Sequence, residues 1–142
     1  MASMQFDWRE YFRLAENLAK GSDEAALRSA ISRTYYYCYH LALQRAQANS
    51  YERIPGEPSH IQLWRQFSGN PEPVCQQLAE IGKRLKEKRE RADYEGFYNR
   101  IQEAAPLLLE KARKFATLLG SLPARHPSPH SQRAGPNRVR LP

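Results

Sequence analysis

Apolar residues recur every three or four positions in five segments of this chain, and this helical period constrains the fold more than any other feature. The five segments are 6–19, 22–50, 59–67, one that runs from Pro71 or Pro73 to 91, and 98–119. Runs of β-branched residues with period two, which would predict strands, are missing. The sequence therefore predicts an all-α, up-down bundle of four to five helices over residues 1–120.

Glycine, serine and proline predict where these helices begin and end. Gly21 is expected to end the first helix, and the hydroxyls of Ser22 and Ser59 are expected to cap the second and third. Pro106 breaks the hydrogen-bond ladder of segment 98–119, so it should kink this helix or mark its true start.

The C-terminal segment 121–142 has a different composition from the rest of the chain. It has no acidic residue and no helical period, and it is rich in proline. We expect it to be a disordered tail. Its arginines supply four of the seven net positive charges, and they are Arg125, Arg133, Arg138 and Arg140. The positive balance favours a polyanion or an acidic protein partner, and ordinary solubility charge stays open as an alternative.

The two cysteines and the hydropathy pattern bear on location. Cys38 and Cys75 form no CxxC pair and no secretory leader is recognisable, so they are expected to be buried thiols in a reducing cytoplasm. No apolar run reaches the length that a bilayer requires, and we expect no membrane association.

Several enzyme classes lack their characteristic residues in this sequence. The acidic residues and the four histidines are scattered, so we expect no metal site and no cofactor. A glycine-rich phosphate loop and a GxSxG elbow are also missing. The chemistry that remains is metal-free cleavage of RNA, in which the ribose 2′-hydroxyl attacks the adjacent phosphate. Histidine and arginine are suited to this reaction as base and phosphate ligand.

The segment RSAISRTYYYCYH, residues 28–40, contains such a pair. Arg33 and His40 lie seven residues apart, almost two helical turns, so both project to nearly the same side about 10 Å apart along the axis. Tyr36 and Tyr37 lie between them on the same stripe and are candidates for RNA binding. Since one histidine does not easily act as both base and acid, we expect a two-fold dimer that joins two such faces.

Structural explanations of the same residues stay open. Arg33 could pair with a carboxylate on the helix surface, and His40 could fill a groove of the bundle. Tyrosines at helical spacing are commonly core or dimer-interface residues, and Tyr35 is expected in the core. The basic run KRLKEKRER, residues 83–91, is by default a solvated face, and it becomes a candidate RNA-backbone contact only if it lies beside the Arg33 stripe.

Three blocks of this chain, in this order, resemble the small bacterial and archaeal HEPN-domain proteins. They are SRTYY with the downstream histidine, GEPSHIQLW, and LKEKRERADYE, which contains the RxxADY pattern at residues 89–94. The resemblance spans roughly residues 22–120. It implies a four- or five-helix bundle that dimerises through the helix bearing Arg33 and His40. It also implies a metal-independent ribonuclease of toxin–antitoxin or other defence systems.

The resemblance carries over Arg33 and His40 as the catalytic pair. It also implies supporting roles for Ser32 and for Asp93 or Tyr94, with Asp93 orienting Arg33. The chain departs from the family at Tyr37 and Cys38, where relatives often have small residues.

A nucleotidyltransferase partner modifies a tyrosine two residues after the histidine in one subfamily, and Ala42 occupies that position here. We therefore expect no regulation by nucleotidylation at this position. The resemblance otherwise implies RNA as substrate and an antitoxin or nucleotidyltransferase as a possible partner. A non-catalytic HEPN module that binds nucleotide, RNA or a nucleotidyltransferase is the main alternative, and a helical adaptor for an acidic protein is a third.

Overall fold

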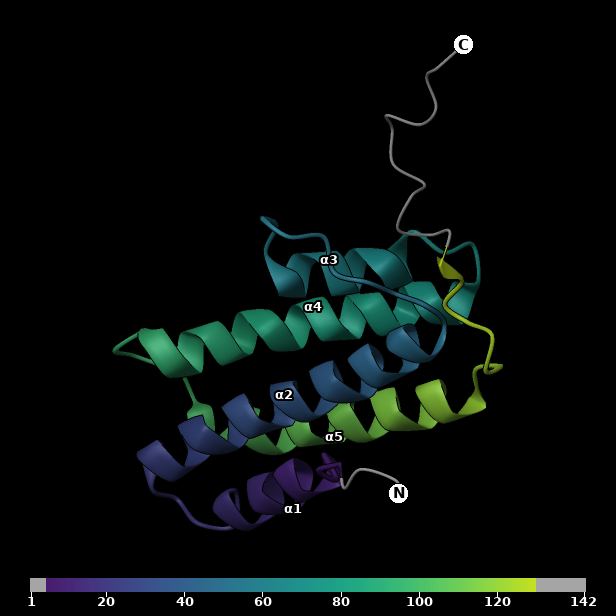
Figure 1. The fold of residues 1–142 in the computed structure, drawn as a ribbon. Helices are drawn as coiled ribbons and strands as arrows, with labels where there is room; N and C mark the ends of the chain where they lie inside the picture. The colour runs from purple at the N-terminus through teal and green to yellow at the C-terminus, as the bar shows by residue number, and fades with distance from the viewer. Residues whose placement is uncertain (1–4, 130–142) are drawn as a thin grey trace.

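Five helices and no strands make up residues 5–129, the part of the chain that the computed structural model describes (Figure 1). The helices are α1 (Arg9–Leu18), α2 (Glu24–Ala48), α3 (Ser59–Ser68), α4 (Pro73–Tyr94) and α5 (Ile101–Ser121). The predicted all-α bundle is thus confirmed. None of the described helices is long and apolar enough to cross a membrane.

The long α2 is the central element of the bundle, because it contacts each of the other four helices. Figure 1 shows α1 on one side of α2, with α4 and α3 on the other, while α5 runs behind α2. The main core lies between α2, α3, α4 and α5, and its largest side chains are Tyr35, Trp64, Phe67 and Phe115. One face of α2 remains uncovered between α1 and α3, and this face carries the candidate site.

The helix ends follow ordinary capping chemistry, with some differences from the sequence-based expectation. The cap of α2 is Asp23 and not Ser22, because the Asp23 carboxylate accepts a hydrogen bond from the Ala26 N–H. Ser59 is the first residue of α3 and provides no cap. Pro73 begins α4 at a position where its missing N–H costs nothing, as predicted.

The helix predicted over 98–119 begins at Ile101. Arg100 has a left-handed backbone, with φ of 53°, so Tyr98 lies before the helix and packs its ring into a smaller core beside Ile31 and Ala105. Pro106 lies inside α5 and does not mark its start. Only the hydrogen bond to the carbonyl four residues earlier is lost there.

Residues 122–129 contact the bundle, which differs from the expected disorder of the whole segment 121–142. Leu122 is buried, and the Arg45 guanidinium of α2 donates hydrogen bonds to the carbonyls of Leu119, Leu122, Pro123 and His126. Gln66 of α3 donates to the Ser128 carbonyl. Arg125 is exposed, and Arg133, Arg138 and Arg140 lie outside the described residues.

Both cysteines are buried free thiols, as the sequence predicts. Burial raises the pKa of Cys38 well above its ordinary value, and it raises the pKa of Cys75 to about 11. A thiol with a raised pKa is a poor nucleophile at neutral pH. The cysteines therefore belong to the packing of the bundle.

Candidate functional site

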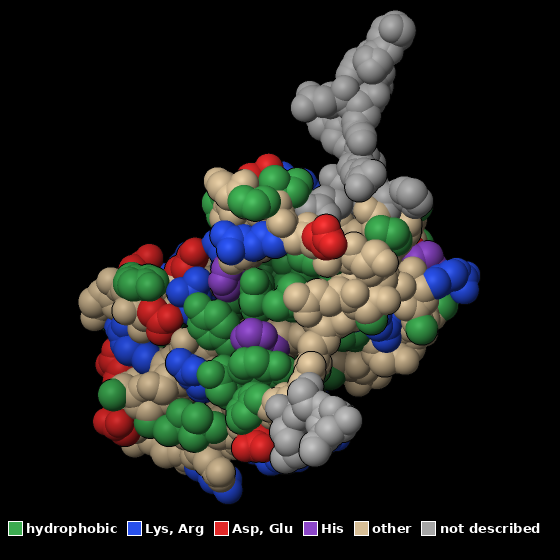
Figure 2. All heavy atoms as spheres, viewed as in Figure 1, with side chains coloured by type: hydrophobic (Ala, Val, Ile, Leu, Met, Phe, Trp, Pro, Cys, Tyr) green, Lys and Arg blue, Asp and Glu red, His purple; other side chains and the backbone are tan. Residues whose placement is uncertain are grey.

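The uncovered face of α2 carries Arg33, Tyr36 and His40, which are three and four residues apart and therefore share one side of the helix. All three side chains are partly exposed, between the buried stripe of α2 and solvent. Figure 2 shows this face as a hydrophobic area that contains histidine side chains and has basic side chains at its border. The predicted pair is thus neither buried in the core nor fully exposed.

Arg33 is held by aromatic rings. Its guanidinium carbon lies 4.9 Å from the ring centre of Tyr11 and 5.9 Å from that of Tyr36. Among the described residues no carboxylate lies within 4 Å of Arg33. The structure thus gives no support to the alternative in which a surface carboxylate pairs with Arg33, and the charge is available to an anion.

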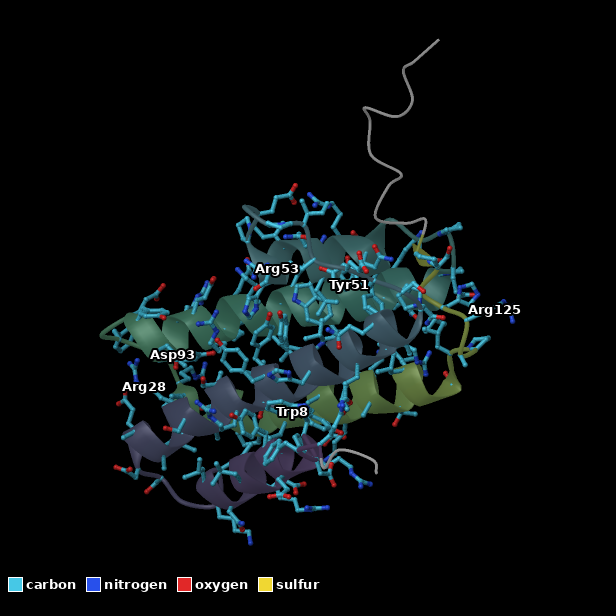
Figure 3. All side chains as sticks on the ribbon, viewed as in Figure 1. Trp8, Arg28, Tyr51, Arg53, Asp93 and Arg125 are labelled. Carbon is cyan, nitrogen blue, oxygen red and sulfur yellow. The ribbon has the colours of Figure 1, made fainter. Side chains whose placement is uncertain are left out.

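His40 lies flat on the indole of Trp8. The two ring centres are 3.4 Å apart and the planes differ by only 3°, while the edge of Tyr39 approaches from the side. Figure 3 labels Trp8 at the start of α1, against α2. Partial burial lowers the pKa of His40, which favours the neutral ring at pH 7. Neither ring nitrogen of His40 forms a hydrogen bond or is enclosed within the described part of the chain.

Tyr36 is the centre of a larger group of residues. Its ring centre lies 5.9 Å from the Arg33 guanidinium carbon, 5.4 Å from that of Arg89, and 6.5 Å and 5.9 Å from the rings of His40 and His60. We call these five residues the Tyr36 cluster. The cluster is built by α2, α3 and α4 within one chain.

Arg89 is the buried cation of the Tyr36 cluster, with 7% of its surface exposed. Besides Tyr36, its guanidinium carbon lies 5.6 Å from the Tyr35 ring and 6.0 Å from the Tyr94 ring. An N–H of Arg89 donates to the Asp93 carboxylate at 3.4 Å. The Glu90 carboxylate lies 3.8 Å from another guanidinium nitrogen, so two carboxylates and three aromatic rings surround this positive charge.

The supporting residues that the resemblance implies lie around Arg89 and not around Arg33. Ser32 donates to the same Asp93 oxygen at 3.3 Å, so Asp93 links α2 to Arg89 on α4. The expectation that Asp93 orients Arg33 is therefore wrong, because its recorded partners are Ser32 and Arg89. Tyr94 is 79% exposed, and its ring centre lies 6.0 Å from the Arg89 guanidinium carbon.

Tyr37 turns away from the cluster. Its ring stacks on Phe12 of α1, with centres 4.9 Å apart, and only 8% of its surface is exposed. Burial raises the pKa of Tyr37. Tyr37 lies four residues after Arg33, at the edge of the stripe that carries Arg33 and His40. The rotation of the helix between Tyr36 and Tyr37 turns the Tyr37 ring toward α1. Its role is in packing, in contrast to the RNA-binding role expected from the spacing.

His60, at the start of α3, is the member of the cluster for which the sequence indicated no role. Its Nδ1 lies 2.5 Å from the Tyr35 hydroxyl, and its ring stacks on Tyr39 at 4.2 Å. Burial, followed by the charges of Arg89 and Lys86, lowers the pKa of His60 to about 4, against the opposing effect of Glu90. Sequence spacing could not have found His60, since it belongs to another helix.

A groove of about 540 Å³ runs between α3 and α4. Lys86 and Trp64 line this groove and place it near His60. The Lys86 charge lowers the pKa of His60, and Trp64 donates a hydrogen bond to Tyr35, the partner of His60. Further basic residues along the groove are Arg65, Lys83 and Arg84, against the acidic Glu80 and Glu87. The basic run 83–91 therefore lies partly beside the cluster.

Comparisons of the chain with protein-family models, with curated proteins and with solved structures find no match. The HEPN resemblance therefore stays a prediction from the sequence blocks. Within residues 5–129, no three histidine, cysteine, aspartate or glutamate side chains come together as metal ligands would.

Proposed function

We propose that this chain is a metal-independent endoribonuclease of HEPN type in which the Tyr36 cluster binds and cleaves RNA. The observation that carries the proposal is the position of Arg33 and His40. They flank one tyrosine ring on a partly exposed face, and Arg33 has no carboxylate partner among the described residues. Their spacing of about 10 Å along α2 leaves room for a phosphate and its ribose.

The chemistry assigns one task to each side chain. Neutral His40 removes the proton of the ribose 2′-hydroxyl, and the resulting oxygen attacks the adjacent phosphorus. The P–O5′ bond breaks, the leaving 5′ oxygen takes a proton from water, and His40 returns its proton to the solvent. The products are a 2′,3′-cyclic phosphate and a free 5′-hydroxyl. Arg33 holds nonbridging phosphate oxygens and stabilises the negative charge of the pentacoordinate transition state. Burial of His40 supports its role as a base, because it favours the neutral ring.

RNA would follow the basic and aromatic side chains across the molecule. The groove between α3 and α4 supplies Lys83 and Arg84 for backbone phosphates, while its Lys86 is ion-paired with Glu90. The aromatic rings of the α2 face, including Trp8 and Tyr36, provide surfaces on which unpaired bases can stack. A single-stranded substrate fits this combination of charge and aromatic surface.

A homodimer that joins two α2 faces, as the resemblance implies, remains part of the proposal. A second imidazole, His60, lies at the same tyrosine within one chain, but its pKa of about 4 leaves it neutral at pH 7, so it does not act as the acid. The dimer would also double the positive charge around one RNA strand. A toxin or defence role, with an antitoxin or nucleotidyltransferase as partner, follows from the HEPN resemblance alone.

The main alternative is a non-catalytic module that binds RNA or a nucleotide on the same face. The flat contact between Trp8 and His40 favours this alternative, since a ring pinned at 3.4 Å suits base stacking as much as proton transfer.

Incubation of the purified protein with RNA in excess EDTA separates the two functions. The ribonuclease yields fragments with 2′,3′-cyclic phosphate ends, while a 2′-O-methyl RNA of the same sequence is bound but left intact. Binding of both RNAs without any cleavage would instead support the non-catalytic module.

A further inference from the structure

Three side chains connect the core of the bundle to the surface of the Tyr36 cluster, and we call them the His60 relay. The indole N–H of Trp64 donates to the Tyr35 hydroxyl oxygen at 3.1 Å, and this hydroxyl lies 2.5 Å from Nδ1 of His60. Trp64 is 1% exposed and Tyr35 is fully buried. The inner end of the relay is thus fixed by packing.

The direction of the protons in the His60 relay follows from this burial. An indole N–H can only donate, so the Tyr35 oxygen is the acceptor in its contact with Trp64. The Tyr35 hydroxyl proton then needs an acceptor of its own, and within the described chain Nδ1 of His60 is the one in reach. Nδ1 of His60 must therefore be unprotonated, which places the ring proton on Nε2.

The proton on Nε2 faces the outside of the molecule. Nε2 of His60 makes no hydrogen bond with the described residues and is not enclosed by them. The ring plane is held by stacking on Tyr39 at 4.2 Å, and the ring lies 5.9 Å from Tyr36. His60 therefore presents a fixed N–H donor at the same tyrosine that Arg33 and His40 flank.

Burial, and after it the charges around His60, keep its ring neutral. Arg89 and Lys86 on α4 and His40 on α2 oppose its protonation, while Glu90 on α4 favours it. Protonation of Nδ1 would also leave the buried Tyr35 proton without an acceptor. A neutral imidazole with a fixed Nε2–H is a hydrogen-bond donor that does not release its proton at working pH.

We propose that His60 donates a hydrogen bond from Nε2 to a nonbridging phosphate oxygen of RNA bound at the Tyr36 cluster, with Tyr35 as the residue that positions its ring. The substrate class rests on the proposed function. His60 stabilises charge on the phosphate, while His40 moves the proton and Arg33 provides the positive charge. Both imidazoles of the site thus belong to one chain.

Two amide substitutions separate the two nitrogens of His60. Asparagine places its polar atoms near the position of Nδ1, so His60→Asn keeps a partner for Tyr35 and loses the outer donor. Glutamine reaches the position of Nε2, so His60→Gln keeps the outer donor. We expect His60→Asn to slow single-turnover cleavage about 100-fold, as the loss of one donor to a developing oxyanion does. His60→Gln should retain most of the rate.

Nuclear magnetic resonance of the imidazole nitrogens tests the same inference without any cleavage. In wild type, His60 should show a protonated Nε2 and an unprotonated Nδ1, and a 2′-O-methyl RNA oligonucleotide should shift the Nε2–H signal. In Tyr35→Phe the fixed tautomer should give way to a mixture of both.

The outcomes distinguish this inference from the proposed function. If wild type cleaves RNA and His60→Asn cleaves it equally fast, the role of His60 is wrong and the nuclease stands. If wild type does not cleave but the oligonucleotide shifts the Nε2–H signal, the donor role stands and the nuclease is wrong. A protonated Nδ1, or an Nε2–H signal that does not shift when the oligonucleotide is added, overturns the proposal about His60.

Discussion

At the scale of single residues, the same side-chain type behaves differently according to its neighbours. His40 and His60 approach the same tyrosine ring, yet one is stacked on an indole and the other is hydrogen-bonded to a buried phenol. His40 keeps both ring nitrogens available to a ligand, whereas the hydrogen bond to Tyr35 fixes the tautomer of His60. The division of roles between base and donor follows from these contacts.

Removing the Trp8 ring should raise the pKa of His40. In Trp8→Leu the imidazole gains contact with water, so its midpoint moves back toward the ordinary histidine value near 6.5. A titration of His40 by nuclear magnetic resonance measures this midpoint. Phe6→Leu is the matched control, because Phe6 touches Trp8 but has no recorded ring contact with His40. An unchanged midpoint in Trp8→Leu would contradict the role of the stack.

The lowered pKa of His60 predicts a loss of stability in acid. As the pH falls from about 6.5, the unfolded chain takes up a proton on His60 while the folded protein does so only near pH 4. The free energy of unfolding should therefore fall through this window, by about 1–2 kcal/mol once solvent screening of the half-exposed ring is included.

Urea denaturation at pH 7 and pH 4.5 measures that loss for wild type and His60→Asn. The variant should lose less stability than wild type, with a remainder from His40, whose pKa is shifted in the same direction. Equal losses in both proteins would contradict the assignment.

At the scale of the helices, the hydrophobic period was sufficient to predict where the helices lie in the sequence. It could not predict which side chains meet between helices. Apolar residues at helical spacing predicted all five helices, since each helix buries one stripe. The spacing also placed Arg33 beside His40, since both lie on one helix. It could not reveal that Arg89 and His60 join them, because the approach of α3 and α4 to α2 depends on packing that no local pattern encodes.

The same limit explains the errors at single positions. Tyr37 and Tyr36 are adjacent in sequence and equally compatible with the stripe. Which of them is buried is decided by α1, whose Phe12 stacks on Tyr37. Segment 122–129 has no hydrophobic period, yet Arg45 of α2 binds its carbonyls.

Gly82 of α4 makes the close approach of α3 possible. A Cβ at this position would overlap the ring carbons of Trp64, which is buried and bonded to Tyr35. Gly82→Ala should therefore lower the free energy of unfolding by about 1–2 kcal/mol, although alanine favours the helix itself. Gly120→Ala is the matched control, because nothing lies within 4 Å of its added Cβ. Denaturant unfolding should show a loss in the first variant and none in the second.

At the scale of the whole molecule, one basic chain brings two guanidinium groups and two imidazoles to a single face. The other basic residues are spread over the helices. Those of the groove between α3 and α4 lie beside the Tyr36 cluster. RNA bound along this groove would release counterions from its backbone.

The groove should therefore determine the salt dependence of RNA binding. For Lys83→Ala combined with Arg84→Ala, the slope of log affinity against log salt for single-stranded RNA should decrease by about 1.4. The control combines Arg13→Ala with Lys20→Ala, on the distant groove between α1 and α5. Its slope should remain that of wild type. Equal effects of both pairs would indicate binding to overall charge and not along the groove.

The cleavage rate of RNA by the His40→Ala variant tests the central claim most directly. It is measured under single-turnover conditions in excess EDTA, beside wild type, Arg33→Ala and His126→Ala, a half-buried histidine outside the Tyr36 cluster. We predict that His126→Ala cleaves as wild type does, and that His40→Ala is slower by a factor of about 100 to 10,000, the range expected for loss of a general base. Arg33→Ala should be slowed to a similar extent. Cleavage by His40→Ala at the wild-type rate and with the same products would contradict the account.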